Sequence, residues 1–276
     1  MADPLTAFFL PVDPGHRFCI YHGPAAGERP RRGVVYVHPF SEEMNKARRM
    51  AALQSRRFAA AGLGVLQIDL HGCGDSSGES ADARWRSWKE DVQAAVAWLR
   101  SRVDGPVSLW GLRLGATLAA DAARDRAMGI EHLYLWQPVL SGEQFLTQFL
   151  RLQLAGEMLA GGAAQSGVRE LRETLARGTS LEIAGYDLHP ELASAIEGLK
   201  LAELVPAVRS ACWLEVSGNP EPRLSPAAQR VVDAWRAQGV DVRTVAVAGE
   251  PFWTTLEITE CAALLDATDA SVKAEN

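Results

Sequence analysis

The segment Gly111-Leu112-Arg113-Leu114-Gly115 has the Gly-x-X-x-Gly spacing of a tight turn between a strand and a helix. An apolar run precedes it and a helix rich in small residues follows it. In enzymes that use such a turn, the central residue is a nucleophile presented at the tip. Here the central residue is Arg113, and a guanidinium group has no nucleophilic atom. The spacing therefore predicts the turn, while its chemistry has to be argued separately.

A second group of reactive side chains lies at the ends of two neighbouring predicted strands. His38 and Glu42, followed by Glu43, come directly after one strand, and His71 and Cys73 occupy the loop after the next. A His38–Glu42 or a Cys73–His71 pair would support acid–base or nucleophilic chemistry. The alternative is that His38 is structural, bound to loop backbone, and that Cys73 is a small turn residue between glycines.

Continuous apolar runs alternate with helical patterns along the chain, which predicts a mostly parallel, doubly wound α/β sheet. The predicted strands are residues 33–38, 63–69, 107–110, 132–137, 211–217 and 242–248. Helices are expected at residues 45–61 and 82–102. Residues 7–23 are expected to add one or two antiparallel edge strands. The carboxyl ends of parallel strands are where such sheets bind ligands, which places the candidate residues at one edge.

We expect one domain that spans residues 1–276. The alternation of predicted strands and helices is interrupted within residues 141–205. Residues 144–159 are apolar at helical spacing, a Gly/Ala-rich break follows at residues 161–164, and residues 168–177 form a more charged helix. We predict a lid-like helical insertion here, the alternative being two ordinary packing helices. The polar tail after Ala267 is expected to fray.

Composition excludes several classes of function. The net charge of −6 and the isoelectric point near 5.6 supply no basic field for nucleic acid. No apolar run approaches the ~20 residues that span a bilayer, and the N-terminus lacks the basic region of a signal sequence. Four scattered cysteines indicate a reducing, cytoplasmic location. No metal-ligand or nucleotide-binding spacing occurs, so no cofactor is expected.

The loop Asp69-Leu70-His71-Gly72-Cys73-Gly74-Asp75-Ser76-Ser77-Gly78 resembles the D-x-x-G-x-G-x-S-x-G loop of the esterase and peptidase branches of the α/β-hydrolase superfamily. Three further segments resemble the exosortase A system-associated hydrolase, type 2: His38-Pro39-Phe40-Ser41-Glu42-Glu43-Met44-Asn45-Lys46, Trp110-Gly111-Leu112-Arg113-Leu114-Gly115 and Pro251-Phe252-Trp253. That family is encoded beside exosortase and exopolysaccharide genes in Gram-negative bacteria. The resemblance implies an α/β-hydrolase fold, but the family's name does not itself establish hydrolysis.

In the implied fold, hydrolysis requires a nucleophile, then a carboxylate, then a histidine, in that order along the chain. Arg113 occupies the nucleophile position, and Glu221 is available at the acid position after the strand at 211–217. The histidine position follows the strand at 242–248, where Glu250 is the ionisable residue. The last histidine in the chain is His189. Two of the three catalytic roles therefore lack their usual residue.

Three interpretations of Arg113 remain open. It forms an ionic cluster with Glu221 and Glu250, since a buried unpaired charge is costly. Alternatively, it points to solvent and both glutamates are surface residues. In the third, Arg113 and the amide of Leu114, with an amide from residues 39–41, hold a carboxylate or phosphate at the helix N-terminus.

The pocket around this turn is expected to involve six residues, listed here: Phe40, Glu42, Leu114, Trp136, Gln137 and Trp253. Core packing explains each tryptophan equally well. The expected partner is an anionic small molecule or a saccharide, and no oligomeric state is predicted. Two functions follow: a non-catalytic or ligand-binding protein of exopolysaccharide export, or a hydrolase of an ester or related bond that uses His38, Glu42, His71 or Cys73.

Overall fold

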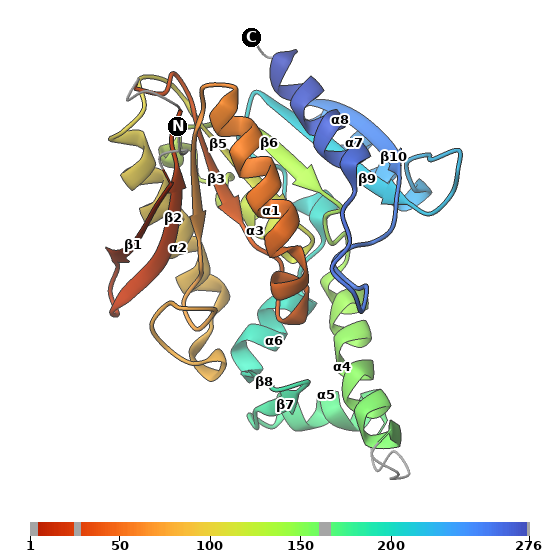
Figure 1. Ribbon diagram of the computed structural model, residues 1–276. Coiled ribbons are helices and arrows are strands. Elements are labelled where there is room, and N and C mark those ends of the chain that lie inside the picture. The colour runs from red at the N-terminus through yellow and green to blue at the C-terminus, as the bar shows by residue number, and fades with distance from the viewer. Residues whose placement is uncertain (1–4, 25–28, 160–166, 275–276) are drawn as a thin grey trace.

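An eight-stranded sheet forms the centre of the computed structural model, which describes residues 5–24, 29–159 and 167–274 (Figure 1). The strand order is β1-β2-β4-β3-β5-β6-β9-β10. The six strands β4, β3, β5, β6, β9 and β10 pair in parallel, and β1 and β2 add an antiparallel edge, as predicted. The strands are β1 (Leu5–Pro11), β2 (His16–His22), β3 (Gly33–Val37), β4 (Gly64–Ile68), β5 (Val107–Leu112), β6 (Ile130–Trp136), β9 (Ser210–Ser217) and β10 (Asp241–Ala248).

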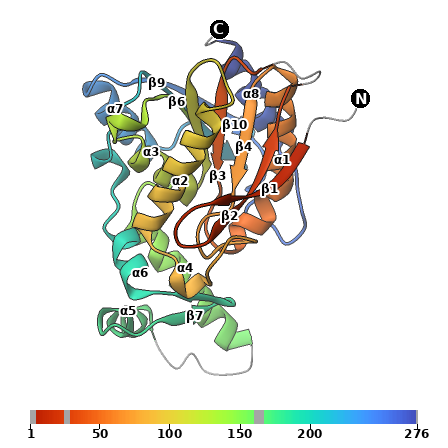
Figure 2. The same ribbon diagram turned by 90° about the vertical axis from the view of Figure 1, so that its left-hand side faces the viewer.

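Helices cover both faces of the sheet, and Figure 2 shows the resulting three layers. Helices α1 (Glu42–Ala60) and α8 (Ala262–Lys273) pack on one face, and α2 (Trp85–Arg100), α3 (Leu114–Ala122) and α7 (Pro226–Ala237) pack on the other. The core is divided in the same way, because successive side chains of a strand point to opposite faces. In β5, Val107 and Leu109 join one apolar cluster while Trp110 and Leu112 join the other. The predicted α/β-hydrolase fold is confirmed.

The segment between β6 and β9 lies below the carboxyl ends of the parallel strands in the view of Figure 1. It contains α4 (Gly142–Leu159), α5 (Val168–Ala176), the hairpin of β7 (Leu181–Ile183) and β8 (Tyr186–Leu188), and α6 (Pro190–Glu197). The predicted break at residues 161–164 lies outside the described residues. The hairpin was not predicted, because its strands have only three residues each and show no measurable alternation. That this segment acts as a lid stays a prediction.

The hairpin is attached to the loops at the edge of the sheet. The Asn45 side-chain amide on α1 donates to the Tyr186 hydroxyl at 3.2 Å. The Asp187 backbone N–H donates to the Ser80 hydroxyl at 2.9 Å in the loop between β4 and α2. These bonds hold the insertion over the edge where the candidate residues lie.

The expectation that the tail after Ala267 frays is wrong up to Lys273. Helix α8 spans this region, and Leu264, Leu265 and Val272 are buried against the α1 face of the sheet. Their spacing is helical, but alanines and acidic residues between them mask the pattern in the sequence. Over the described residues, no helix combines the length and apolar character needed to cross a membrane.

Candidate ligand-binding site

Arg113 stands at the tip of the turn between β5 and α3, as predicted. Its backbone has φ 55° and ψ −122°, a conformation that side chains rarely adopt. The two flanking glycines make the turn possible. A Cβ on Gly115 would lie 2.3 Å from the carbonyl oxygens of Val37 and His38, and one on Gly111 would lie 2.5 Å from the Ala116 Cα. The strained backbone therefore presents Arg113 at the carboxyl edge of the sheet.

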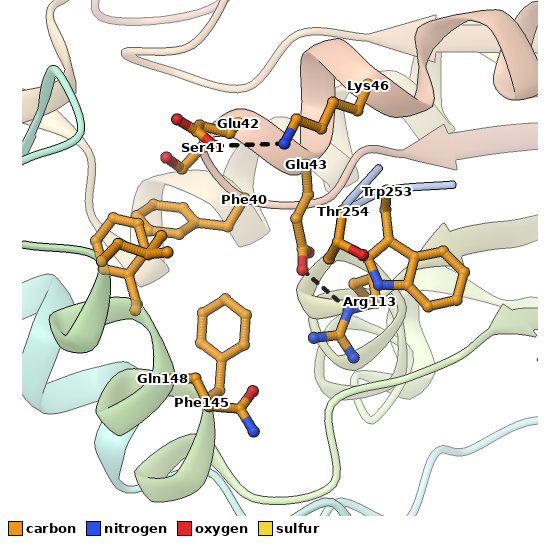
Figure 3. Close-up of a pocket in the computed structure, with 12 residues that line it drawn as sticks. Phe40, Ser41, Glu42, Glu43, Lys46, Arg113, Phe145, Gln148, Trp253 and Thr254 are labelled. Atoms are coloured by element: carbon orange, nitrogen blue, oxygen red, sulfur yellow. Dashed lines mark hydrogen bonds and ion pairs between the residues drawn. The ribbon is translucent and has the colours of Figure 1, made fainter. Parts of the chain in front are cut away.

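Arg113 forms an ion pair with Glu43, which lies in the first turn of α1. Its Nε donates to Glu43 Oε1 at 3.1 Å, and the two side chains are only 18% and 17% exposed (Figure 3). The guanidinium carbon lies 5.6 Å from the centre of the Trp253 ring. Burial raises the pKa of the Glu43 carboxyl, and the nearby Arg113 charge acts in the opposite direction. The second oxygen, Oε2, is buried without a hydrogen-bond partner among the described residues.

The structure does not bring Glu221 or Glu250 to Arg113, so the predicted cluster does not form. Glu221 pairs with Arg223 at 3.7 Å, and both side chains are 85% exposed. Glu250 is exposed in the loop after β10, and no ion pair within 4.0 Å joins it to Arg113 in the described parts of the chain. The carboxylate that pairs with Arg113 is that of Glu43 on α1. Helix α1 follows β3, and β3 is the neighbour of β5 in the sheet, so α1 begins beside the turn at Arg113.

A cavity of about 220 Å³ opens above the Arg113–Glu43 pair (Figure 3). Four separate parts of the chain line it: the start of α1, the turn at Arg113, helix α4 and the loop after β10. Its apolar wall consists of Phe40, Phe145, Phe149, Leu152 and Trp253. Its polar side consists of Ser41, Glu42, Glu43, Lys46, Arg113, Gln148 and Thr254. The cavity thus combines a mostly aromatic wall with two ion pairs, Arg113–Glu43 at 3.1 Å and Lys46–Glu42 at 3.6 Å. Small-molecule sites commonly join an apolar lining to a few polar groups in this way.

Three of the six predicted pocket residues line this cavity: Phe40, Glu42 and Trp253. Leu114 is buried behind it, beside a void of about 10 Å³. Trp136 and Gln137 do not line it, which corrects the prediction.

Both residues are instead used inside the fold. The Trp136 indole N–H donates to the Thr268 hydroxyl on α8 at 3.0 Å. The Gln137 side-chain oxygen accepts from the Val216 backbone N–H at 2.8 Å. Strand alternation directs Trp136 into the layer between the sheet and helices α1 and α8, which the position of a strand end does not reveal.

His38 is held by backbone groups on both sides of its ring. The Leu70 backbone N–H donates to Nε2 at 3.1 Å, so Nε2 is unprotonated, and Nδ1–H donates to the Pro39 carbonyl at 2.7 Å. Burial lowers the pKa of the ring, partly offset by the Asp69 charge, and thereby favours this neutral form. The alternative interpretation, in which His38 is a structural residue bound to loop backbone, is confirmed.

Cys73 and His71 do not form a nucleophile–base pair. Burial, together with the negative charges of Asp69 and Asp91, raises the pKa of the Cys73 thiol to about 12. The thiol is therefore protonated at neutral pH and a poor nucleophile. Burial lowers the pKa of His71, and no hydrogen bond joins its ring to Cys73 within the described residues.

Sequence reasoning missed Ser41 and the aromatic residues of α4 as parts of the site. Ser41 begins α1 with φ 55° and ψ −134°, close to the backbone conformation of Arg113. It is 8% exposed, and its hydroxyl lacks a partner among the described residues. The position of Ser41 before Glu42 predicts only an ordinary helix cap. Phe145 and Phe149 have the spacing of one helix face, which equally predicts core packing.

Comparisons with known proteins agree with this geometry. The family model described as "Serine aminopeptidase, S33" matches residues 28–183, more than half of the chain. No curated protein matches the chain.

Among solved structures, a ferulic acid complex of Est1E from Butyrivibrio proteoclasticus is similar at 14% identity and TM-score 0.67, covering 98% of this chain and 97% of that one. A thermostable carboxyl esterase from Bacillus coagulans has 15% identity and TM-score 0.65, with the same coverage. Mouse α/β-hydrolase domain-containing protein 10 has 15% identity and TM-score 0.56, covering 98% of both chains. At these identities the similarity shows the fold. Together with the matched family model, it identifies this chain as a member of the serine aminopeptidase S33 family of α/β-hydrolases.

Proposed function

We propose that this protein binds a small acyl compound in the cavity above Arg113 and does not hydrolyse it through a serine triad. One observation carries this proposal: at the nucleophile position, an arginine paired with Glu43 faces an apolar cavity. The ligand would have an acyl chain or ring against the aromatic wall. Its polar group would meet the Arg113–Glu43 pair.

The pair offers both a donor and an acceptor to a ligand. Of the three guanidinium nitrogens of Arg113, only Nε donates a hydrogen bond within the described residues, and the two terminal nitrogens extend into the cavity beside Gln148 (Figure 3). Glu43 Oε2 is a buried acceptor that has no partner among the described residues. A group that accepts from Arg113 and donates to Glu43, such as a carboxamide, satisfies both.

Charge favours a neutral group over the anion that Arg113 alone suggests. When both side chains are ionised, the Arg113–Glu43 pair has no net charge. An anion placed beside it is attracted by Arg113 but repelled by the Glu43 carboxylate, which has an oxygen left unpaired. We therefore expect a carboxylate to bind less well than the corresponding amide.

Three features support a function without hydrolysis. The central residue of the turn has no nucleophilic atom, and the loop after β10 offers Glu250 and Pro251 where a triad has its histidine. His38 is fixed as a neutral ring by backbone bonds. Cys73 is a protonated thiol. The alternative hydrolase based on these residues therefore lacks an activated nucleophile–base pair.

We further propose that the protein is cytoplasmic and contributes to exopolysaccharide export. The basis is its resemblance to the exosortase A system-associated hydrolase, type 2. The segments that carry the resemblance, residues 38–46, 110–115 and 251–253, all contribute to the one cavity. A strain with Arg113→Met and Glu43→Gln in the chromosomal gene should lose exopolysaccharide at the cell surface while retaining the protein. Normal export in that strain would contradict this role.

Binding is tested by calorimetry with three probes that share an eight-carbon acyl chain: octanamide, methyl octanoate and octanoate. Octanamide should bind best, and the ester should bind about tenfold more weakly, because it lacks the donor for Glu43. The double variant Arg113→Met/Glu43→Gln should lose this preference, while Arg223→Met, on the exposed surface, should keep it. Failure of octanamide to bind the wild type, or equal affinities for amide and ester, would overturn the proposal.

A further inference from the structure

A second cavity, of about 320 Å³, lies on the other side of Phe40 and Ser41. It is bounded by the start of α1, the loop between β4 and α2, and the β7–β8 hairpin of the insertion. Phe40 and Ser41 line both cavities and therefore stand between them. A ligand that passes these two residues would occupy both cavities at once.

Ser41 provides a free polar group at this junction. Its side chain is more than nine-tenths buried, and its hydroxyl makes no hydrogen bond in the described residues. A serine at the start of a helix usually accepts from a backbone N–H of the first turn, but Ser41 does not. A buried hydroxyl without a partner is costly, and a ligand that bridges the two cavities would satisfy it.

The second cavity has the lining expected for a neutral, hydroxyl-bearing group. Asn45, Ser80 and Tyr186 contribute neutral polar side chains, and no Lys or Arg is among the lining residues, all of which are described. Glu79 and Asp187 disfavour an anion. Met44, Phe40 and Trp88 supply an apolar surface for the C–H face of a ring.

The hydroxyl-binding side chains are also fixed in position. The Tyr186 hydroxyl accepts from the Asn45 side-chain amide at 3.2 Å, which fixes the phenol in the cavity lining and leaves its O–H to donate to a ligand. Ser80 accepts from the Asp187 backbone N–H at 2.9 Å and likewise keeps its own proton available. The hairpin thus makes the cavity together with α1.

We propose that the second cavity binds a sugar or polyol that is attached to the acyl group held in the first cavity, with Ser41 at the linkage. The ligand class is therefore an acylated sugar, joined through an amide or a similar group. This inference rests on the proposed function, because it extends the ligand from the Arg113–Glu43 cavity. It also assigns the β7–β8 hairpin to recognition of the sugar.

The test compares N-octanoyl-glucosamine with octanamide by calorimetry on the full chain. The two probes share the acyl chain, the amide carbonyl and an amide N–H, and the sugar replaces the second amide hydrogen, so the difference in affinity reports the effect of that replacement. We expect the glucosamide to bind about tenfold more tightly, as two or more added hydrogen bonds would allow. Tyr186→Phe, in the second cavity only, should remove most of this gain while leaving octanamide affinity unchanged. Ser41→Gly should also reduce the gain, and its affinity for octanamide is measured separately because Ser41 lines both cavities. Asn219→Ala, in an exposed loop, is the matched control.

The possible outcomes separate the two proposals. Binding of octanamide with no gain from the sugar, or a gain that survives in Tyr186→Phe, overturns the second subsite and leaves the acyl site intact. Absence of binding by both probes overturns both proposals. If only the glucosamide binds, and Tyr186→Phe abolishes that binding, the sugar site is supported. The same result contradicts binding of the acyl group without a sugar. Glycine is chosen at position 41 because it adopts φ 55° without strain.

Discussion

The Nε of Arg113 and the Oε1 of Glu43 lie 3.1 Å apart, although 70 residues separate them in the chain. Each belongs to the start of a helix that follows one of two adjacent parallel strands, β3 and β5. The pair places a donor and an acceptor together at the tip of the turn. In the function proposed above, it contributes to the stability of the site and to the choice of ligand.

Replacing Arg113 alone should destabilise the protein. In Arg113→Met, the Glu43 carboxyl remains mostly buried without its partner, which should cost about 2 kcal/mol of unfolding free energy. The double variant Arg113→Met/Glu43→Gln should recover most of this loss, because no buried charge remains. Urea denaturation measures these differences, with Arg223→Met as the exposed control. Equal stability of Arg113→Met and the wild type would show that the pair is solvated.

The contribution of Glu43 to stability should fall as pH rises. Burial raises the pKa of Glu43 in the folded state above its ordinary value of 4.5, so the folded protein holds the proton more strongly than the unfolded chain does. Glu43 contributes most at pH values below its ordinary pKa, and this contribution is lost as pH rises through the folded pKa. Glu43→Gln lacks the titrating group.

The measurement is the difference in unfolding free energy between the wild type and Glu43→Gln across this pH range. The wild type should lose stability relative to the variant as pH rises above 4.5. A relative gain of the wild type over that range would mean that the Arg113 charge outweighs burial.

His38 should remain a neutral ring, with its proton on Nδ1, at pH values below its ordinary pKa of 6.5. The Leu70 N–H blocks protonation at Nε2, and burial disfavours the cation. Nitrogen chemical shifts of the labelled imidazole report both the tautomer and the titration. Protonation of His38 at its ordinary value of 6.5 would reopen its role as an acid–base group.

Restoring a serine at the turn should not restore hydrolysis. Arg113→Ser supplies the hydroxyl, but the loop after β10 has no histidine to accept its proton. We expect neither turnover of p-nitrophenyl esters nor rapid labelling by a fluorophosphonate probe, in the wild type or in this variant. The Bacillus coagulans carboxyl esterase is a suitable positive control. Turnover by the wild type would favour the hydrolase alternative, and mapping of any labelled residue would identify its nucleophile.

Much of the central sheet and of the turn at Arg113 could be predicted from local sequence. Residues 33–37 form an apolar run that is buried along its whole length, and such runs are typical of parallel strands covered on both faces. The turn at Arg113 follows from Gly111 and Gly115, since no larger residue fits at either position. By contrast, the β7–β8 hairpin and α8 were missed, because three-residue strands and an alanine-rich helix carry weak patterns.

The sequence by itself determined the fold class, the position of Arg113 and the absence of a histidine after β10, because each depends on residue types at fixed spacings. Only the tertiary structure decided that Arg113 pairs with Glu43 and not with Glu221 or Glu250. The physical reason is that ion pairs depend on which loops converge and how their side chains are buried. Those properties arise from the packing of β3 beside β5 and of the insertion beneath them.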